Sequence, residues 1–256
     1  MTLKAVDYDV VQHDVYAVGR AMAPGTLEAW MDAFAQWWPS RRPLRLLDLG
    51  SGVGRFTPAL AARFGGPVYG VEPSVKMRAV AEASAGHPAV SYLAGEAAVI
   101  PLEDATIDGA LMFLSLHHVP DLPAATTEIA RVLRQNARLQ IVSGFSDRAA
   151  GASWWHRFFP RAGEIERSMF PSAAQVVGPF AAAGLALVTL DRVRTLQWES
   201  VAAAAAQLRL RPYSTFEHLT EPEIVEGLAR LEAAVGGDES AGPIYGFSDR
   251  MVLEKT

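Results

Sequence analysis

The sequence of 256 residues contains no cysteine. Without thiols the chain has no disulfide framework, no thiolate metal site and no cysteine nucleophile, which agrees with a reducing compartment. No apolar run approaches the ~18 residues that are needed to cross a bilayer. Residues 1–16 also lack the apolar core of a signal peptide. These absences predict a cytoplasmic protein that does not associate with membranes.

Positive charge is also in short supply. The chain has 23 Lys and Arg residues against 28 Asp and Glu residues, and its net charge is -5. An acidic chain lacks the basic surface that attracts polyphosphates, so nucleic acid is not expected as a partner. Hydrophobic residues make up 50% of the sequence and charged residues 20%, which is typical of a globular protein. The length suits one large α/β domain, which we expect to be a monomer or a homodimer.

Short apolar runs alternate with helical patterns in the middle of the chain, between residues 44 and 145. The strands expected from these runs are 44–49, 68–71, 90–94, 107–114 and 139–142, and the helices between them are 55–64, 74–83 and 124–133. The run 107–114 is almost continuously apolar, as expected for a strand that is covered on both faces. The alternation predicts a mostly parallel sheet with helices on both faces.

The two ends of the chain are expected to build onto this core. Residues 27–38 have helical spacing, and a capping box of Thr220 and Glu223 opens a helix near the other end. A helix is expected over 176–184, and strands over parts of 185–198 and over 246–253. We therefore expect a single domain over 1–256, in which 1–40 form a helical cover and 151–175 and 199–240 are insertions around the last strands.

A glycine-rich turn follows the first expected strand, in the segment Asp48-Leu-Gly50-Ser-Gly52-Val-Gly54. Glycines let the backbone turn sharply and let a ligand approach closely, and the helix that follows presents free N–H groups. The spacing G-x-G-x-G differs from the G-x-G-x-x-G of dinucleotide-binding folds. Asp48 is unfavourable beside a pyrophosphate and suits a ligand with a positively charged amino group. Both observations disfavour a nicotinamide-dependent oxidoreductase.

Two more acidic residues stand at the ends of expected strands. Glu72 ends the second strand, where a carboxylate can accept hydrogen bonds from both hydroxyls of a ribose. Glu96 follows the third strand directly and can accept a hydrogen bond from the exocyclic amine of adenine. The alternative for each is a solvated carboxylate in a surface loop. Together with the glycine turn, the two acids favour an adenosine-containing ligand.

Three segments resemble the class I S-adenosylmethionine-dependent methyltransferases, and most of all the small-molecule enzymes around ubiquinone and menaquinone biosynthesis. These segments are DLGSGVGRF, VYGVEPS and residues 95–134, and the resemblance extends over 44–145. It implies a Rossmann-like seven-stranded sheet, S-adenosylmethionine as cofactor with S-adenosylhomocysteine as product, and a small-molecule acceptor, as in many natural-product pathways. The sequence departs from the usual pattern of this family at two places. Glu96 stands where Asp is usual, and Gln135-Asn136-Ala137 stands in place of Pro-Gly-Gly.

The same resemblance assigns residues to the cofactor. Leu114 matches the position beside the sulfonium, Met77 a contact near the adenine, and Arg20 a partner for a carboxylate of the cofactor or the substrate. The full set of expected cofactor-binding residues is Tyr16, Arg20, Asp48, Gly50, Ser51, Gly52, Glu72, Pro73, Met77, Glu96, Ala97 and Leu114. For Tyr16 and Arg20, the alternative is an ordinary surface helix.

Candidate catalytic residues follow the fourth and fifth strands. Methyl transfer from a sulfonium releases a neutral thioether, so it requires alignment and, for a hydroxyl acceptor, a base. His117 and His118 stand at the strand end that faces the crevice, and the imidazole pKa of roughly 6.5 suits that role. Asp147 can orient such a histidine. The alternatives are that His118 only holds the loop by hydrogen bonds and that Asp147 caps a helix or turn. The pair favours oxygen as the methylated atom, and its spacing matches no metal-ligand signature.

Aromatic residues favour an apolar or ring-bearing acceptor. Those expected to face it are Trp154, Trp155, Phe158 and Tyr213, and core packing is their alternative. A nucleic-acid methyltransferase is disfavoured because residues 114–117 do not form an Asn-Pro-Pro-Tyr-like step. A protein of the same fold that binds the cofactor without transferring its methyl group remains the second hypothesis, because intact cofactor motifs do not distinguish it.

Overall fold

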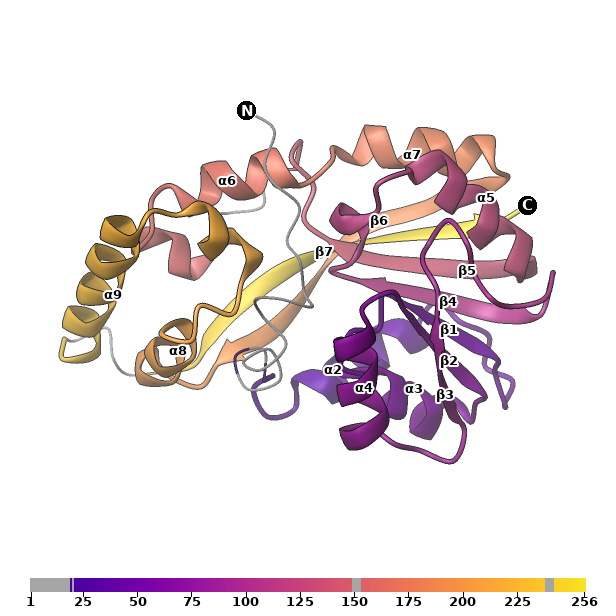
Figure 1. Cartoon of the computed structure of the whole chain (residues 1–256), viewed down its shortest axis with the longest axis horizontal. Helices are drawn as coiled ribbons and strands as arrows, with labels where there is room; N and C mark the ends of the chain where they lie inside the picture. Colours follow the sequence, from indigo (N-terminus) through magenta and orange to yellow (C-terminus); the bar gives the residue numbers. More distant parts are fainter. Residues whose placement is uncertain (1–18, 20, 149–152, 238–241) are drawn as a thin grey trace.

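A single seven-stranded sheet organises the chain in the computed structural model, which describes residues 19, 21–148, 153–237 and 242–256 (Figure 1). The strand order is β3-β2-β1-β4-β5-β7-β6. The strands are β1 (Leu46–Leu49), β2 (Val68–Glu72), β3 (Val90–Ala94), β4 (Ile107–Phe113), β5 (Leu133–Ser143), β6 (Leu185–Trp198) and β7 (Ile244–Lys255). Neighbours among β1–β5 pair in parallel, and β7 is antiparallel to both β5 and β6. The predicted Rossmann-like, mostly parallel sheet is confirmed.

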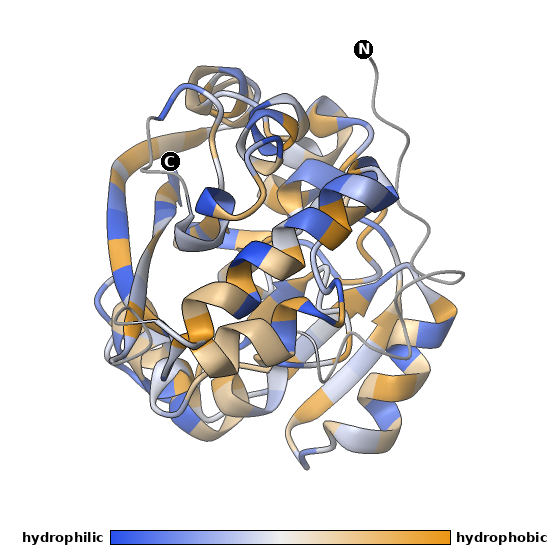
Figure 2. Ribbon diagram, turned by 90° about the vertical axis from the view of Figure 1, so that its left-hand side faces the viewer, coloured by the Kyte–Doolittle hydropathy of each residue, from blue (hydrophilic) through white to orange (hydrophobic). Residues whose placement is uncertain are grey.

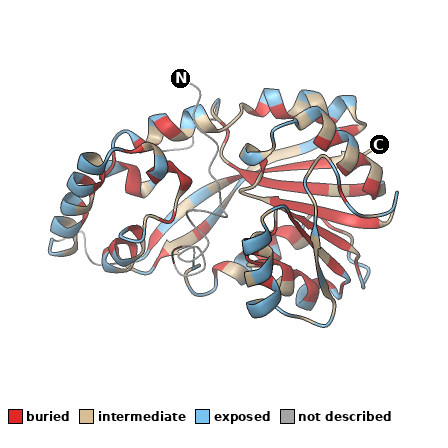
Figure 3. Cartoon of the chain, viewed as in Figure 1, coloured by how far each residue is buried: buried red, intermediate tan, exposed pale blue. Residues whose placement is uncertain are grey.

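Helices cover both faces of this sheet. The α-helices are α2 (Thr26–Ala35), α3 (Thr57–Phe64), α4 (Val75–Ser84), α5 (Leu122–Val132), α6 (Ala162–Met169), α7 (Ala173–Ala182), α8 (Val201–Leu208) and α9 (Glu221–Val235). One buried cluster joins the sheet to α5 and α7, and a second joins it to α2 and α3. Figure 3 accordingly shows buried strands between helices whose outer sides are exposed. Within the described ranges, no helix is long and apolar enough to cross a membrane.

The helix ends obey the local rules that the sequence indicated. Ser74 caps α4 by accepting a hydrogen bond from the Met77 amide, at 3.1 Å. Gly65 ends α3 in the left-handed conformation, with φ of 86°. The Thr220 amide donates to the Glu223 carboxylate at 2.7 Å, as the predicted capping box requires. Such caps satisfy helix-end groups that would otherwise lack partners and are each worth about 1 kcal/mol.

The turn before β5 differs from the sequence expectation, because the strand begins at Leu133 and not at residue 139. Leu133 pairs with Ile107, and the ladder resumes at Gly109 and Arg138 after a register shift. Asn136 lies in this irregular stretch with φ of 63°. Asparagine tolerates the left-handed conformation better than most residues, so Asn136 suits this turn.

A second lobe lies beyond the sheet, on the extended ends of β6 and β7 (Figure 1). Its helices are α6, α8, α9 and the short 3₁₀ turns η2 (Trp154–Arg157) and η3 (Ser214–His218). They share one buried cluster, in which Trp155 stacks on Tyr213 at 5.2 Å and on Phe216 at 5.4 Å. Figure 2, seen from the side of this lobe, shows polar and apolar residues mixed along its helices. The described residues of the expected insertions 151–175 and 199–240 supply most of this cluster, and Trp198 of β6 and Ile244 of β7 complete it.

Helices α6 and α8 were not expected from the sequence. Helix α8 is VAAAAAQL, and a run of alanines has the highest helix propensity but no polar-apolar period to read. Helix α6 is short, at 8 residues, and follows an aromatic segment that showed no period. The alanine run thus hides α8, and the aromatic segment before α6 obscures where that short helix begins.

Trp155→Ala should lower the free energy of unfolding by about 3–5 kcal/mol, because it empties the centre of the second lobe. Urea unfolding followed by circular dichroism measures this change. Trp154→Ala is the matched control, since Trp154 is only partly buried and lies at the edge of the same cluster. An equal cost for both variants would contradict the placement of Trp155 at the centre.

Candidate functional site

The glycine turn is fixed to its neighbouring strands by backbone hydrogen bonds. The amides of Gly50 and Ser51 both donate to the Val71 carbonyl, at 2.8 and 3.2 Å. Ser115, at the end of β4, donates its hydroxyl to the Leu49 carbonyl at 2.9 Å. A methyl group on Gly50 would lie 2.5 Å from the Ser115 Cβ, so only glycine permits this approach. Ser115 was not among the expected site residues.

Gly52 and Gly54 serve different purposes in this turn. Both have positive φ, of 56° and 78°. A Cβ on Gly54 would lie 2.2 Å from the Tyr92 hydroxyl, so that glycine allows close packing. A Cβ on Gly52 would meet no atom of the described chain within 4 Å. The open side of Gly52 therefore leaves room for a ligand to contact the backbone.

Glu72 joins the glycine turn to the start of α4. Its Oε2 accepts a hydrogen bond from the Gly52 amide, and its Oε1 accepts one from the Ser74 amide, both at 2.9 Å. The side chain is buried at the end of β2, on the same sheet edge as the glycine turn. This carboxylate is therefore held beside Gly52, at the place where the sequence predicts a ribose.

Asp48 is a buried carboxyl group beneath the glycine turn. It accepts a hydrogen bond from the Thr57 hydroxyl at 2.7 Å. Burial raises the pKa of Asp48 from 3.8 to about 6; the Thr57 hydrogen bond and Arg55 oppose this rise, and the negative charge of Glu72 adds to it. Because desolvation disfavours the charged carboxylate of Asp48, a cation bound close to it would stabilise this charged form.

The remaining expected cofactor residues differ in exposure. Met77 is buried on α4, Ala97 is half-buried, and Pro73 and Glu96 are exposed. Glu96 lies in a tight turn after β3, where the Val99 amide donates to the Glu96 carbonyl at 3.0 Å. Tyr16 and Arg20 lie outside the described residues. The structure thus gathers the glycine turn, Glu72 and the end of β3 at one edge of the sheet.

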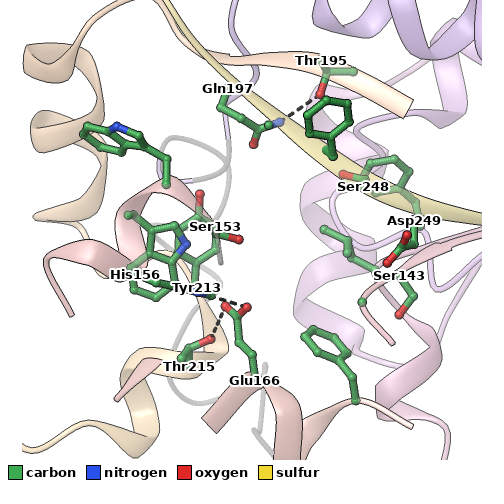
Figure 4. Close-up of a pocket in the computed structure, with 18 of the residues that line it drawn as sticks. Ser143, Ser153, His156, Glu166, Thr195, Gln197, Tyr213, Thr215, Ser248 and Asp249 are labelled. Atoms are coloured by element: carbon green, nitrogen blue, oxygen red, sulfur yellow. Dashed lines mark hydrogen bonds and ion pairs between the residues drawn. The ribbon is translucent and has the colours of Figure 1, made fainter. Parts of the chain in front are cut away.

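A cavity of about 850 Å³ lies between this sheet edge and the second lobe (Figure 4). The cavity begins at Leu114, the residue after β4. Leu114 has a φ of 54°, and its amide donates a hydrogen bond to the Val142 carbonyl at 2.8 Å. The expected residues that line it are Leu114, His117, Asp147, Trp154, Trp155 and Tyr213. His118 and Phe158 are not in the lining. Phe158 is instead buried in the second lobe, where its ring meets Trp154 edge-on at 4.9 Å.

The expected catalytic residues are separated by this arrangement. The rings of His117 and His118 lie 3.9 Å apart in the 3₁₀ turn η1 (Leu116–His118), and His117 also contacts Phe170 at 4.7 Å. Of the two histidines, His117 lines the cavity and His118 does not. Asp147 accepts a hydrogen bond from the Ala173 amide at 2.8 Å, so it caps the start of α7. The capping alternative for Asp147 is therefore the one that the contacts favour.

One polar group on the far wall of the cavity was not expected. His156 Nε2 lies 3.1 Å from Glu166 Oε2, and the Thr215 hydroxyl donates to Glu166 Oε1 at 3.2 Å. Figure 4 shows these side chains together on the wall formed by the second lobe. They come from η2, α6 and η3, which are far apart in sequence. No spacing rule connects such residues, so only the tertiary structure reveals the group.

A second unexpected polar group lies on the wall nearer the sheet. Asp249 Oδ1 accepts hydrogen bonds from Arg148 Nε at 2.9 Å and from Arg192 Nε at 3.1 Å. All three residues line the cavity. Strand pairing brings Asp249 to this place, because it pairs with Ser143 on β5 and with Arg192 on β6, and no sequence pattern indicated that register. Within the described ranges, no three His, Asp or Glu side chains are grouped as a metal would require.

Comparisons with known proteins agree with this geometry. Residues 47–141 match the family model described as "Methyltransferase domain". The chain is 32% identical over 124 residues to a 2-phytyl-1,4-naphtoquinone methyltransferase of Trichormus variabilis, covering 46% of this chain and 54% of that protein. It is 35% identical over 112 residues to the O-methyltransferase rstn1 of Aspergillus nomiae, covering 42% and 50%. The chain thus spans about half the length of the curated relatives that it matches.

The fold is shared over nearly the whole chain with a solved structure. That protein, from Anabaena variabilis, is assigned as a methyltransferase of an antibiotic biosynthesis pathway. The TM-score is 0.70 at 22% identity, covering 89% of this chain and 96% of the other. The resemblance predicted from the three sequence segments is confirmed. Residues 47–141 of this chain therefore match a methyltransferase domain, in agreement with the resemblance that the three segments predict.

Proposed function

We propose that the chain transfers a methyl group from S-adenosylmethionine to an oxygen atom of a small-molecule acceptor and releases S-adenosylhomocysteine. The observation that carries this proposal is the open side of Gly52 beside Glu72, at the same sheet edge as a large, partly aromatic cavity. One edge thus offers room for a cofactor and, next to it, room for an acceptor. The similarity to a named O-methyltransferase supports oxygen as the methylated atom.

The residues present fit the cofactor. Glu72 would bind the ribose, the glycine turn would contact the methionine part, and Leu114 would lie beside the sulfonium. The buried Asp48 would favour the positively charged amino group, because a cation relieves the cost of its burial. When bound, the cofactor supplies an electrophilic methyl group. The chain's own task is then to hold the acceptor in line and to exclude water.

Two features of the cavity favour that task. Trp154, Trp155 and Tyr213 give it apolar walls, which lower the local dielectric constant around a reaction that neutralises charge. His117 lies in the turn that follows Leu114, so it is placed to accept the proton of an acceptor hydroxyl. We propose His117 as the base; His118 would hold the turn.

The same proposal includes the roles of the chain segments, the class of substrate and the state of the protein. Residues 1–40 would cover the cofactor, and the insertions 151–175 and 199–240 would enclose the acceptor within one domain. The acidic net charge supports a small molecule over nucleic acid as the substrate. A cytoplasmic monomer or homodimer is the state we propose for the working protein.

The cofactor is tested by calorimetric titration of the protein with S-adenosylmethionine, S-adenosylhomocysteine and NAD in parallel. Micromolar binding of the two adenosyl ligands, without binding of NAD, is the expected result. Folded protein that binds neither adenosyl ligand would overturn the proposal. Binding without conversion of S-adenosylmethionine in a broad acceptor screen would favour the non-methylating alternative.

Gly52→Ala should weaken S-adenosylhomocysteine binding by at least about tenfold, or about 1.4 kcal/mol, because the added methyl group occupies the ligand's space. Gly184→Ala is the matched control: its φ is 83° and the nearest atom to an added Cβ is 3.9 Å away, before β6 at the other edge of the sheet. Both variants should lose a similar stability of about 1 kcal/mol. Equal loss of affinity in both would show that strain, and not ligand contact, is responsible.

His117→Asn should lower kcat by about 10²–10⁴-fold with an acceptor found by screening, while S-adenosylhomocysteine binds as before. Formation of S-adenosylhomocysteine measures the rate. His118→Asn, its neighbour outside the cavity lining, should retain most of the activity. A larger loss in His118→Asn than in His117→Asn would reject the assignment of the base.

Asp48→Asn should change how stability depends on pH. The folded protein holds a proton on Asp48 up to pH about 6, whereas the unfolded chain releases it near pH 3.8. The contribution of Asp48 is therefore complete below pH about 4 and is lost as pH rises through about 6. Urea unfolding between pH 4 and 7 should show the variant gaining about 2–3 kcal/mol over wild type. A difference between variant and wild type that stays constant over this pH range would contradict the burial effect.

A further inference from the structure

Arg148 and Arg192 form a guanidinium pair on the sheet-side wall of the cavity. Both donate through Nε to the same oxygen, Asp249 Oδ1. The Asp249 side chain is 1% exposed, whereas those of Arg148 and Arg192 are 28% and 37% exposed. The carboxylate therefore lies beneath the two arginines and holds them side by side at the cavity surface.

The sheet itself fixes the position of this carboxylate. Asp249 stands on β7 between Ser143 of β5 and Arg192 of β6 in the strand ladder. Arg148 follows β5 and reaches the same oxygen from the loop side. Because Asp249 is anchored by two paired strands, the arginines that it binds are preorganised before any ligand arrives.

The outer nitrogens of both arginines, their Nη atoms, are the next feature. In the described part of the chain, neither Arg148 nor Arg192 makes a hydrogen bond through its Nη atoms. Arg250 behaves differently, since its Nη atoms bond to the Ala33 carbonyl and to Asp191. Arg148 and Arg192 both line the cavity, so their free donors can serve a ligand there. Two parallel N–H donors on a planar guanidinium match the two oxygens of a carboxylate.

The charge of the cavity agrees with an anionic ligand. Its described lining holds four arginines and three carboxylates, which leaves one net positive charge, although the whole chain has a net charge of -5. These residues are Arg55, Arg148, Arg167 and Arg192, with Asp147, Glu166 and Asp249. A single positive charge suits a monoanion better than a dianion. The balance therefore favours a carboxylate over a phosphate monoester.

We propose that the acceptor carries a carboxylate, and that Arg148 and Arg192 bind it. This rests on the proposed function of the cavity as the acceptor site. Neighbouring strands are about 4.8 Å apart, so Asp249 on β7 lies about 10 Å from the end of β4, two strands away. The carboxylate of the acceptor consequently anchors its far end at the two arginines, and the acceptor atom that is methylated lies near Leu114. Trp154, Trp155 and Tyr213, which belong to the second lobe, give the same cavity its apolar lining.

The test uses the protein without cofactor and two probes of equal shape, 2-naphthoate and the uncharged 2-naphthamide. Ligand-observed NMR titration gives both dissociation constants. Wild type should bind the carboxylate at least tenfold more tightly than the amide. Arg148→Gln and Arg192→Gln should each reduce this preference to less than threefold and leave the affinity for the amide unchanged. Both side chains are partly exposed, so the variants should fold.

Arg194→Gln is the matched control for a change in net charge. Arg194 stands two residues from Arg192 on the same strand, but its guanidinium lies 3.8 Å from the Tyr245 ring and it does not line the cavity. This variant should keep the wild-type preference. An equal loss in Arg194→Gln, no preference in wild type, or tighter binding of 2-naphthyl phosphate than of 2-naphthoate would each overturn the carboxylate assignment.

Titration of the same samples with S-adenosylhomocysteine separates this proposal from the proposed function. The arginine variants should bind it as wild type does. Binding of S-adenosylhomocysteine without a preference for the carboxylate would reject the anchor alone. A preference for the carboxylate without any binding of S-adenosylhomocysteine would reject methyl transfer and leave an anion-binding cavity.

Discussion

Five parallel strands end at one edge of the sheet, and the whole site depends on this constraint. The glycine turn follows β1, Glu72 ends β2, and Leu114 follows β4. Because parallel strands point the same way, groups that are far apart in sequence meet at their carboxyl ends. Glu72 then secures the arrangement by binding the amides of Gly52 and Ser74, which ties the turn to the next helix.

Buried carboxylates organise the two halves of the site in different ways. Asp48 lies beneath the glycine turn with Thr57 as its hydrogen-bond donor, and burial raises its pKa. Asp249 lies beneath the cavity wall and is paired with two arginines. A carboxylate that is poorly compensated favours a positive ligand, whereas one that orients two guanidinium groups presents positive charge outward. Under the two proposals, the same residue type would thus prepare one region for a cation and the other for an anion.

The sequence was informative where local rules decide the structure. The alternation of strands and helices over 44–145, the Ser74 cap and the Thr220–Glu223 capping box all follow from short-range patterns. The family resemblance of this region was also readable, because each of its three segments is continuous in sequence. Helix α8 gives no periodic signal because it is rich in alanine, and β5 starts earlier than expected because Leu133 already pairs with Ile107.

The sequence by itself determined the sheet of parallel strands, the glycine turn and the acid at the end of β2, because each depends on residues that are neighbours in the chain. Only the tertiary structure decided which side chains line the cavity. It placed His117 in the lining and His118 outside it, and it buried Phe158 in the second lobe. It also brought Arg148, Arg192 and Asp249 together, through strand pairing across 101 and 57 positions of sequence. Contacts at such separations depend on strand order and register, which no local pattern encodes.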